Sequence, residues 1–351
     1  MRSHDELTDQ QRVIINRLQL DIPMVPEPFK VMASELGLSE QTLLDEIQVL
    51  KRDFLVIRQL SAIFDTRNLG YTSSLVALAV PEDKVTHAAR MVNQHPGVSH
   101  NYLRSHRFNI WYTIALPKSV SLEESVALLQ ERAEGEKSLI LPTLKMYKIA
   151  VRLDMSGGED KAFVEAQKKI THKEGVKFEA TEQDIAAVRE LQKDLPLVSR
   201  PFQGYAKAMG ITEAELLEMA NGYQASGVMR RFSAVLRHHK AGFSHNVMAV
   251  WIVPEDRWEE CGSKMAVAPN VSHCYRRPTY LPDWPYTHFT MIHGTSPEDC
   301  EASIRWIQEQ TGLQDYACLT SLKELKKIRL KYYTPELDNW LPEKMRALQP
   351  A

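Results

Sequence analysis

Two short segments place histidine, tyrosine and arginine at every second position. The six residues are His100, Tyr102 and Arg104 in the first segment and His273, Tyr275 and Arg277 in the second. Alternate residues of a β-strand share a face, so each set is expected to line one face of a strand. Arginine binds carboxylates through two parallel hydrogen bonds, and histidine exchanges a proton near neutral pH. These two faces could therefore hold a polyanionic ligand and move protons to or from it.

Further polar and aromatic residues are expected near the same faces. They are His106, Asn109 and Trp111 in the first segment, Arg276, Trp284, Tyr286 and His288 in the second, and Lys145 and Lys148 on a later strand. The apolar residues Phe108, Ile110, Tyr112 and Ile114 are expected to pack beneath helices instead. A slot lined by arginine, histidine, tyrosine and tryptophan suits a flat, aromatic, polyanionic ligand.

A purely structural role is the alternative for each of these residues. A single histidine on a strand is more often structural than catalytic, and tyrosine or tryptophan on a sheet more often packs an interface. Packing alone, however, has little use for two histidines, an arginine and two aromatic side chains on one face. The combination favours a ligand site, while for each single residue a structural role remains an alternative.

The chain contains an internal duplication. Val80-Pro-Glu-Asp83 recurs as Val253-Pro-Glu-Asp256 (253 − 80 = 173 positions), and the Pro96–His100 segment recurs as Pro269–His273. A repeat of this length is a multi-element module rather than a solenoid unit. The copies diverge just after the shared histidine, which predicts a composite site between two similar halves that pair as an internal pseudo-dimer.

Each copy is expected to begin with a winged helix-turn-helix. Thr8-Asp-Gln-Gln11 is a capping box that opens a helix over 7–20, a short helix follows over 28–36, and Ser39 caps a third helix. The segments 54–58 and 61–64 are predicted to form a two-stranded wing, and the second copy repeats this order over 181–237.

The rest of each copy alternates strands and helices in the order βαββαβ, which predicts a ferredoxin-like module. The predicted class is α+β. The expected boundaries are 1–65 and 179–237 for the helix-turn-helix domains, 66–155 and 238–333 for the ferredoxin-like modules, 156–178 for a linker, and 334–351 for an irregular tail. Single strands are expected over 141–151 and 314–331.

Bulk properties exclude several classes of protein. The net charge of −2 provides no global positive field for nucleic acid or membranes. No apolar run reaches the length of a membrane span, and the polar N-terminus does not resemble a signal peptide. The four cysteines contain no C-x-x-C pair, which argues against an iron–sulfur cluster or a zinc ribbon. A cytoplasmic protein is expected.

The helix-turn-helix domains are poorly suited to DNA. A recognition helix needs arginine or lysine toward phosphates and bases. The acidic residues of the two third helices are Glu40, Asp45, Glu46 and Asp53 in the first copy and Glu213, Glu215 and Glu218 in the second. The first copy has only Lys51 and Arg52 against them, and segment 212–221 has no basic residue. These helices are expected to serve packing or dimerisation.

Two long segments resemble a known enzyme family. The segments 97–113 and 271–294 are similar to the signature segments of the siroheme decarboxylases, Lrp/AsnC-like proteins of haem d1 and alternative haem biosynthesis. Members usually occur as two subunits of the NirD/NirL or AhbA/AhbB type, and this chain resembles the fused form from about Leu7 to Tyr333. It departs from relatives at Thr287-His288, where they often have Asn-Leu.

The resemblance implies a reaction and its participants. Siroheme would lose CO2 from its C12 and C18 acetates, with no cofactor beyond the iron of the substrate, to which a histidine could be an axial ligand. His100 and His273, with His106 as a further candidate, would donate protons, and Arg104, Arg276 and Arg277 would hold carboxylates. The alternative is an Lrp-type transcriptional regulator that senses a small molecule or tetrapyrrole through the same slot. No DNA or membrane partner is expected, and further assembly into a homo-oligomer stays open.

Overall fold

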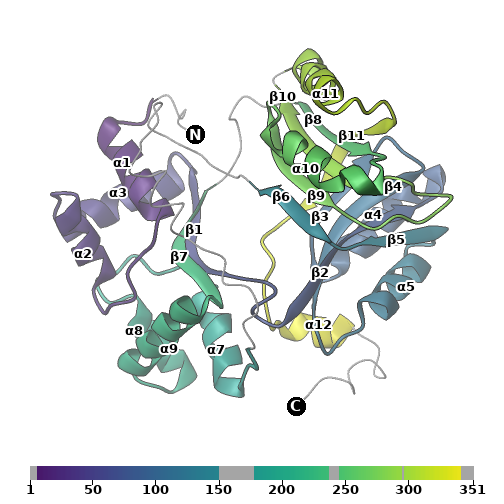
Figure 1. Cartoon of the computed structure of the whole chain (residues 1–351). Coiled ribbons are helices and arrows are strands. Elements are labelled where there is room, and N and C mark those ends of the chain that lie inside the picture. Colours follow the sequence, from purple (N-terminus) through teal and green to yellow (C-terminus); the bar gives the residue numbers. More distant parts are fainter. Residues whose placement is uncertain (1–5, 150–177, 237–244, 295, 341–351) are drawn as a thin grey trace. The chain divides into compact units, whose positions relative to one another are not determined.

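The computed structural model describes residues 6–149, 178–236, 245–294 and 296–340 (Figure 1). These residues form two compact units. One unit contains the described residues of 1–71, 153–239 and 331–333, and the other contains those of 72–152, 240–330 and 334–351. The predicted linker at 156–178 lies outside the described residues except for Phe178. No helix in the described part of the chain is long and apolar enough to cross a membrane.

The first unit holds the helical halves of both copies. Its elements are α1 (Asp9–Gln19), α2 (Pro28–Glu35), α3 (Glu40–Arg52) and β1 (Ile57–Phe64), followed in the second copy by α7 (Glu182–Leu191), α8 (Phe202–Met209), α9 (Glu213–Ser226) and β7 (Met229–Leu236). Side chains cap the helices as predicted: Thr8 and Gln11 form a capping box, and the Ser39 hydroxyl accepts from the Thr42 amide. Gly210 ends α8 at a φ of 71°, a left-handed conformation that glycine adopts without a steric penalty.

The two strands predicted for the wing at 54–58 and 61–64 are a single strand, β1, in the structure. The amides of Phe54 and Val56 donate to Val49 and Leu50 at the end of α3, so this segment closes the helix instead of forming a strand. Phe54 and Val56 are buried there. The remaining strand β1 pairs antiparallel with β7, which makes a two-stranded sheet shared by the two copies.

The second unit holds both ferredoxin-like modules. The first module consists of β2 (Tyr71–Ala79), α4 (Val85–Gln94), β3 (Val98–Arg104), β4 (Phe108–Pro117), α5 (Leu122–Arg132), β5 (Lys137–Leu141) and β6 (Lys145–Ile149). The second consists of β8 (His245–Trp251), α10 (Trp258–Val267), β9 (Val271–Arg276), β10 (His288–Gly294), α11 (Pro297–Thr311) and β11 (Tyr316–Lys327). Short 3-10 turns precede α4 and α10, over Glu82–Lys84 and Glu255–Arg257.

The two modules form one nine-stranded sheet in the order β5-β2-β4-β3-β11-β8-β10-β9-β6. Strand β11 pairs with β8 over its first half and with β3 over its second half, while β6 pairs with β9. Each module thus supplies a strand to its partner, and the predicted internal pseudo-dimer is confirmed. The single strand predicted over 141–151 is instead two strands, because Pro142 lacks an amide donor and the chain changes partners there.

Helices cover the outer side of each module (Figure 1). Helices α4 and α5 pack on strands of the first module, and α10 and α11 pack on strands of the second. In addition to the core under the helices of each module, one apolar cluster contains side chains from the strands of both modules, including Ala77, Leu139, Val250 and Leu319. The two helix-free inner faces therefore share one core.

The C-terminal segment was expected to be irregular, but Pro335–Trp340 forms helix α12. Leu337 is buried in the core of the first module. The Trp340 ring lies 4.0 Å from the His95 ring, and the Arg132 guanidinium lies 4.4 Å from the Trp340 ring. Burial of Leu337 and the contacts of Trp340 hold this helix against the first module. Residues 341–351 lie outside the described residues.

Candidate active site

The predicted rows of histidine, tyrosine and arginine lie on the inner faces of β3 and β9. Between them, Asn101 donates to Asn93 of α4, and Cys274 donates to the Gly262 carbonyl of α10. These intervening side chains point toward the helices, so the rows point to the helix-free side. Across the strands, Tyr102 pairs with Trp111 and Tyr275 pairs with Phe289.

Within each row the side chains are stacked in sequence. The ring centroids of His100 and Tyr102 are 6.4 Å apart, and the Arg104 guanidinium lies 5.5 Å from the Tyr102 ring. In the second copy the corresponding distances are 6.0 Å for His273 and Tyr275 and 4.9 Å for Arg277 and Tyr275. The alternation read from the sequence therefore gives two matching rows.

The two inner-face arginines have the same unusual surroundings. Arg104 donates from Nη1 to the Leu319 carbonyl at 3.0 Å, and Arg277 donates from Nη1 to the Leu141 carbonyl. In both, Nε is buried and has no hydrogen-bond partner in the part of the chain that the structure describes. Among the described residues, neither guanidinium has an ion-pair partner. Burial lowers the pKa of each to about 10, which reflects a cation deprived of water without a neutralising carboxylate.

The histidines of the two rows differ in their hydrogen bonds. Ser99 Oγ lies 2.9 Å from His100 Nδ1, and Ser272 Oγ lies 2.7 Å from His273 Nδ1. In the second copy, Ser272 Oγ also lies 2.6 Å from His293 Nε2, and His293 Nδ1 is bonded to Asn246 Oδ1. Burial, followed by the neighbouring His293, lowers the pKa of His273 to about 4.

The charge of one lysine, Lys327, affects a histidine of each copy. Burial and then the Lys327 charge lower the pKa of His100, and the same two causes lower the pKa of His293. Lys327 is paired with His100 across β11 and β3. A single charge that acts on residues of both copies is consistent with a composite site.

Sequence reasoning missed four of these residues: Ser99, Ser272, Asn246 and His293. The repeated Val-Ser-His sequence carried a signal for both serines, because it places a hydroxyl beside each histidine. His293 stands in the second segment that was singled out, but no residue pattern distinguished it from a core histidine. Asn246 lies on a different strand and had no signal.

An aromatic cluster occupies the inner face beside the rows. Trp284 lies 5.4 Å from both His106 and Trp111, and 4.9 Å from Tyr286, measured between ring centroids. Trp111 donates to the Phe108 carbonyl, whereas the buried Nε1 of Trp284 has no partner. His106 accepts from the Phe108 amide at Nδ1, and burial followed by the charge of Arg107 lowers its pKa.

The placement predicted for Phe108 is wrong. Its neighbours Ile110, Tyr112 and Ile114 pack under the helices as expected, but Phe108 belongs to the inner cluster. It is the first residue of β4, where the chain leaves the turn at 105–107, and its ring packs against Trp284 at 6.1 Å.

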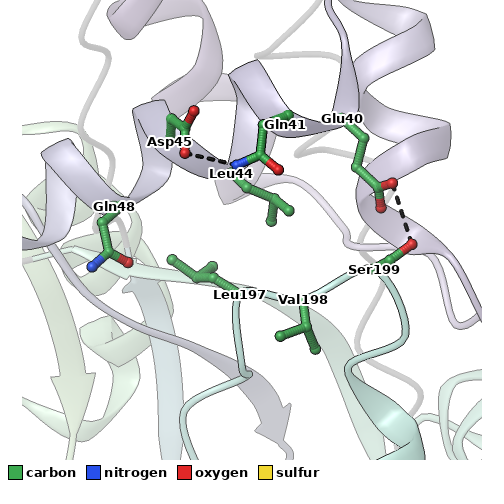
Figure 2. A pocket seen from close by; sticks show the side chains of 8 residues that line it. All are labelled: Glu40, Gln41, Leu44, Asp45, Gln48, Leu197, Val198 and Ser199. Carbon is green, nitrogen blue, oxygen red and sulfur yellow. Dashed lines mark hydrogen bonds between the residues drawn. The ribbon is translucent and has the colours of Figure 1, made fainter.

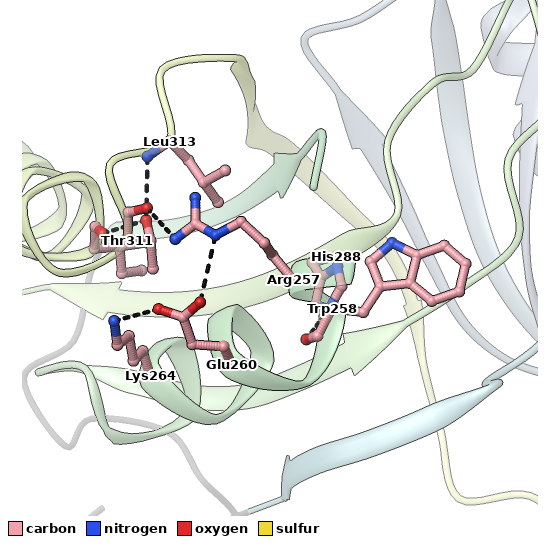
Figure 3. A network of polar contacts seen from close by, with 8 residues as sticks. Arg257, Trp258, Glu260, Lys264, His288, Thr311 and Leu313 are labelled. Atoms are coloured by element: carbon pink, nitrogen blue, oxygen red, sulfur yellow. Dashed lines mark hydrogen bonds and ion pairs between the residues drawn. The ribbon is translucent and has the colours of Figure 1, made fainter. Parts of the chain in front are cut away.

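Three predicted site residues lie on the helix-covered side instead. His288 is fully buried, and its Nε2 donates to the Trp258 carbonyl at the start of α10 (Figure 3). The Arg276 guanidinium lies 4.2 Å from the Trp258 ring, and Lys145 forms an ion pair with Glu259 of α10. His288 was expected beside Tyr286, but it takes the strand position that Ile110 has in the first copy. Burial lowers its pKa to about 4.

The Asn109 side chain is hydrogen-bonded to backbone groups. Its side chain accepts from the Val80 amide at 3.1 Å and donates to the Val80 carbonyl at 2.8 Å. In the second copy Thr287 accepts from the Val253 amide at 3.3 Å. Thr287-His288 therefore occupies the place of Asn109-Ile110 and holds the end of a strand. Lys148 is half-buried on β6, opposite Cys274.

A separate pocket lies in the helical unit, and none of the predicted site residues lines it (Figure 2). Its volume is about 480 Å³, and it is lined by Glu40, Gln41, Leu44, Asp45, Gln48, Leu197, Val198 and Ser199. It contains two carboxylates and no cationic side chain, which is unsuitable for a polyanion. The described residues include no group of three or more histidine, cysteine, aspartate or glutamate side chains that could hold a metal ion.

Known protein families match both halves of the chain. The AsnC-like ligand binding domain matches residues 68–148 and 240–326, and the siroheme decarboxylase NirDL-like HTH domain matches 11–58 and 184–230. The siroheme decarboxylase of Hydrogenobacter thermophilus is 41% identical over 95% of this chain and 98% of its own length. The siroheme decarboxylase beta subunit of Desulfovibrio desulfuricans is 42% identical over 43% of this chain and 96% of its own length.

A solved structure matches nearly the whole chain. The crystal structure of the siroheme decarboxylase NirDL in complex with an iron-uroporphyrin III analogue has a TM-score of 0.78 and 36% identity, covering 97% of this chain and 100% of that one. Two helix-turn-helix and two ligand-binding copies on one polypeptide are the features of the fused form. The chain therefore belongs to the siroheme decarboxylase family, as a fused NirDL-type member of Lrp/AsnC-like fold.

Proposed function

We propose that this chain removes the C12 and C18 acetate carboxyl groups of siroheme as CO2 and releases 12,18-didecarboxysiroheme, an intermediate of haem d1 or alternative haem biosynthesis. The family supports the reaction class. The observation that carries the proposal is the pair Arg104 and Arg277, two guanidinium groups on the helix-free face with buried Nε atoms and no ion-pair partner among the described residues.

The arginines would hold carboxylates that remain on the macrocycle. A buried charge without a partner is costly, and an anionic substrate removes that cost by supplying one. In each arginine, Nη1 already donates a hydrogen bond to a backbone carbonyl. This bond fixes the orientation of the guanidinium before the substrate binds. Orientation in advance reduces the entropy lost on binding.

Tyr102, Tyr275 and the cluster around Trp111 and Trp284 would contact the flat face or edge of the macrocycle. The Tyr102 and Tyr275 rings lie beside the arginines on the same face, and Trp111 and Trp284 are buried in the apolar cluster shared by the two modules. Lys148 is half-buried on β6 and stays a further candidate for a carboxylate, although its strand partner Cys274 points toward the helices. Arg276, Lys145, Asn109 and His288 are not assigned to the substrate, since each is engaged with helix or backbone groups.

The histidines would supply the protons. When the bond between the acetate CH2 and its carboxylate breaks, the electron pair can pass into the conjugated ring as CO2 leaves. The carbon then takes a proton and becomes a methyl group. His100 and His273 stand at corresponding positions, so one would donate that proton, and the other would serve the second acetate, orient a carboxylate or bind the iron of siroheme. His106, next to Trp284, is the further candidate.

Anaerobic incubation of the purified chain with siroheme, followed by mass spectrometry, tests the proposal. Successive losses of one and two CO2 are expected. Unchanged siroheme would contradict it, and specific binding to duplex DNA would then favour an Lrp-type regulator. We expect no such binding, because α3 carries the exposed Asp45 and the half-buried Glu40, whose charges duplex phosphates would repel.

A further inference from the structure

The second copy contains a hydrogen-bonded chain that ends at its row histidine. His273 Nδ1 is bonded to Ser272 Oγ at 2.7 Å, Ser272 Oγ to His293 Nε2 at 2.6 Å, and His293 Nδ1 to Asn246 Oδ1. His293 and Asn246 face each other across β10 and β8. All three polar side chains behind His273 are therefore connected, and Ser272 Oγ also lies 3.3 Å from the Met291 carbonyl, a longer contact to which it can donate instead.

The first copy lacks this chain. His100 has the equivalent serine contact with Ser99 at 2.9 Å. The strand registers place Ala115 where the second copy has His293. The offset of the repeat places Ser73 where the second copy has Asn246 (246 − 173 = 73). Ala115 has no group that carries a proton, and Ser73 is exposed. The two row histidines are thus chemically different despite their matching positions.

We propose that His293 is a proton reserve for His273, that Asn246 fixes the orientation of this reserve, and that the second copy therefore supplies the proton taken by the nascent methyl carbon. This inference rests on the proposed decarboxylation. His293 and Asn246 are positioning residues, since they act through Ser272 and His273.

The proton transfers balance along the chain. In the charged state, His293 carries protons on both nitrogens: Nδ1 donates to Asn246 and Nε2 donates to Ser272. Ser272 then donates to His273 Nδ1, so His273 Nε2 carries the proton that faces the substrate. When that proton passes to carbon, the serine proton moves to His273 Nδ1 and the His293 Nε2 proton moves to Ser272. His293 ends neutral, still bonded to Asn246 through Nδ1.

Such a chain answers a chemical difficulty. Burial lowers the pKa of His273 to about 4, so this side chain is neutral near pH 7. A neutral imidazole is a poor acid unless a proton arrives at its other nitrogen as it donates. His293 can provide that proton through Ser272 when it is in its charged state, and burial followed by the Lys327 charge lowers the pKa of His293 as well. His100 has no such supply, which suits it to orienting a carboxylate or binding iron.

The resting state gives a test that needs no substrate. When His293 is neutral, its Nε2 accepts from Ser272, so Ser272 must accept from His273, and His273 carries its proton on Nδ1. Nuclear magnetic resonance of ¹⁵N-histidine in the full chain reports this tautomer. His293→Ala is expected to shift His273 toward the Nε2 tautomer, and Asn246→Ala is expected to disturb the His293 tautomer. Ser73→Ala, at the matching site of the first copy, should change neither. Unchanged tautomers in both second-copy variants would overturn the proposal.

A kinetic test follows with siroheme. His293→Ala, or His293→Asn if the alanine variant does not fold, should bind siroheme as tightly as the wild type and lose roughly 10²-fold in kcat, within the range of a general acid. Ser73→Ala should retain the wild-type kcat. Wild-type kcat in a folded His293 variant would overturn the proton reserve. Failure of the wild type to convert siroheme would instead overturn the proposed function, and the tautomer test would still be decisive for the hydrogen-bonded chain.

Discussion

Arg104 and Arg277 correspond to each other in the repeat, and so do the carbonyl groups to which they bond. Arg104 of the first copy donates to Leu319 of the second, and Arg277 of the second donates to Leu141 of the first. Leu141 and Leu319 are themselves equivalent, because they pair with the matching strand residues Leu75 and Met248. The exchange of strands between modules thus fixes both arginines on equivalent carbonyls, and Arg104 Nη1 donates in addition to Ser321 Oγ at 3.0 Å.

Removal of either inner-face arginine should weaken siroheme binding. Loss of one charged hydrogen-bonding partner costs about 1.5–3 kcal/mol, or roughly a ten- to hundredfold rise in Kd. Arg104→Ala and Arg277→Ala can be compared with the wild type by absorbance titration. Arg107→Ala is the control, because its guanidinium forms an exposed ion pair with Asp283. Wild-type Kd in both inner-face variants would remove these arginines from the site.

Removal of a row histidine should affect turnover more than binding. His100→Ala and His273→Ala are expected to bind siroheme, while the histidine that donates the proton loses roughly 10²–10⁴-fold in rate. Mass spectrometry of timed samples would also detect a species that has lost a single CO2. Complete conversion at the wild-type rate by both folded variants would show that the acid lies elsewhere.

His288 should be dispensable for the reaction. It lies on the helix-covered side, bonded to the Trp258 carbonyl, so His288→Leu is expected to keep the wild-type kcat and lose about 1 kcal/mol of stability. The measurements are kcat with siroheme and urea unfolding. A large fall in kcat without a change in the free energy of unfolding would show that His288 takes part in the reaction.

The same residue predicts a dependence of stability on pH. Burial lowers the pKa of His288 in the folded chain to about 4 from an ordinary value of 6.5. The contribution of neutral His288 to the free energy of unfolding is complete above about pH 6.5. It is lost as the pH falls toward 4, because the unfolded chain then binds a proton that the folded chain does not. The slope for one such group is at most about 1.4 kcal/mol per pH unit. His288→Leu should therefore lose less stability than the wild type between about pH 7 and about pH 5.

Helix α12 should stabilise the first ferredoxin-like module. Leu337 is 6% exposed within that core, so Leu337→Ala is expected to lower the free energy of unfolding by about 2–4 kcal/mol. The exposed neighbour Glu336 gives a matched control, and Glu336→Ala should have little effect. Equal urea midpoints for the two variants would mean that α12 contributes nothing to this core.

Local periodicity in the sequence was sufficient to predict much of the fold. The offset of the repeat, the capping boxes and the alternation along β3 and β9 all depend on neighbours in sequence, and these predictions agree with the structure. Alternation also assigned Ile110, Tyr112 and Ile114 to the helix-covered side correctly. The family could be recognised because the two long segments are specific in residue type as well as in spacing.

The tertiary structure decided what periodicity could not. The face of His288 depended on where regular pairing of β10 resumes after a connection longer than the turn at 105–107, so counting from Tyr286 gave the wrong side. The exchange of β6 and β11 depends on pairing between residues far apart in the chain, which no local pattern encodes. The connection from His273 to Asn246 likewise exists only because β8, β9 and β10 lie side by side. The sequence thus determined which side chains were present and how they alternate, whereas strand pairing decided which of them meet.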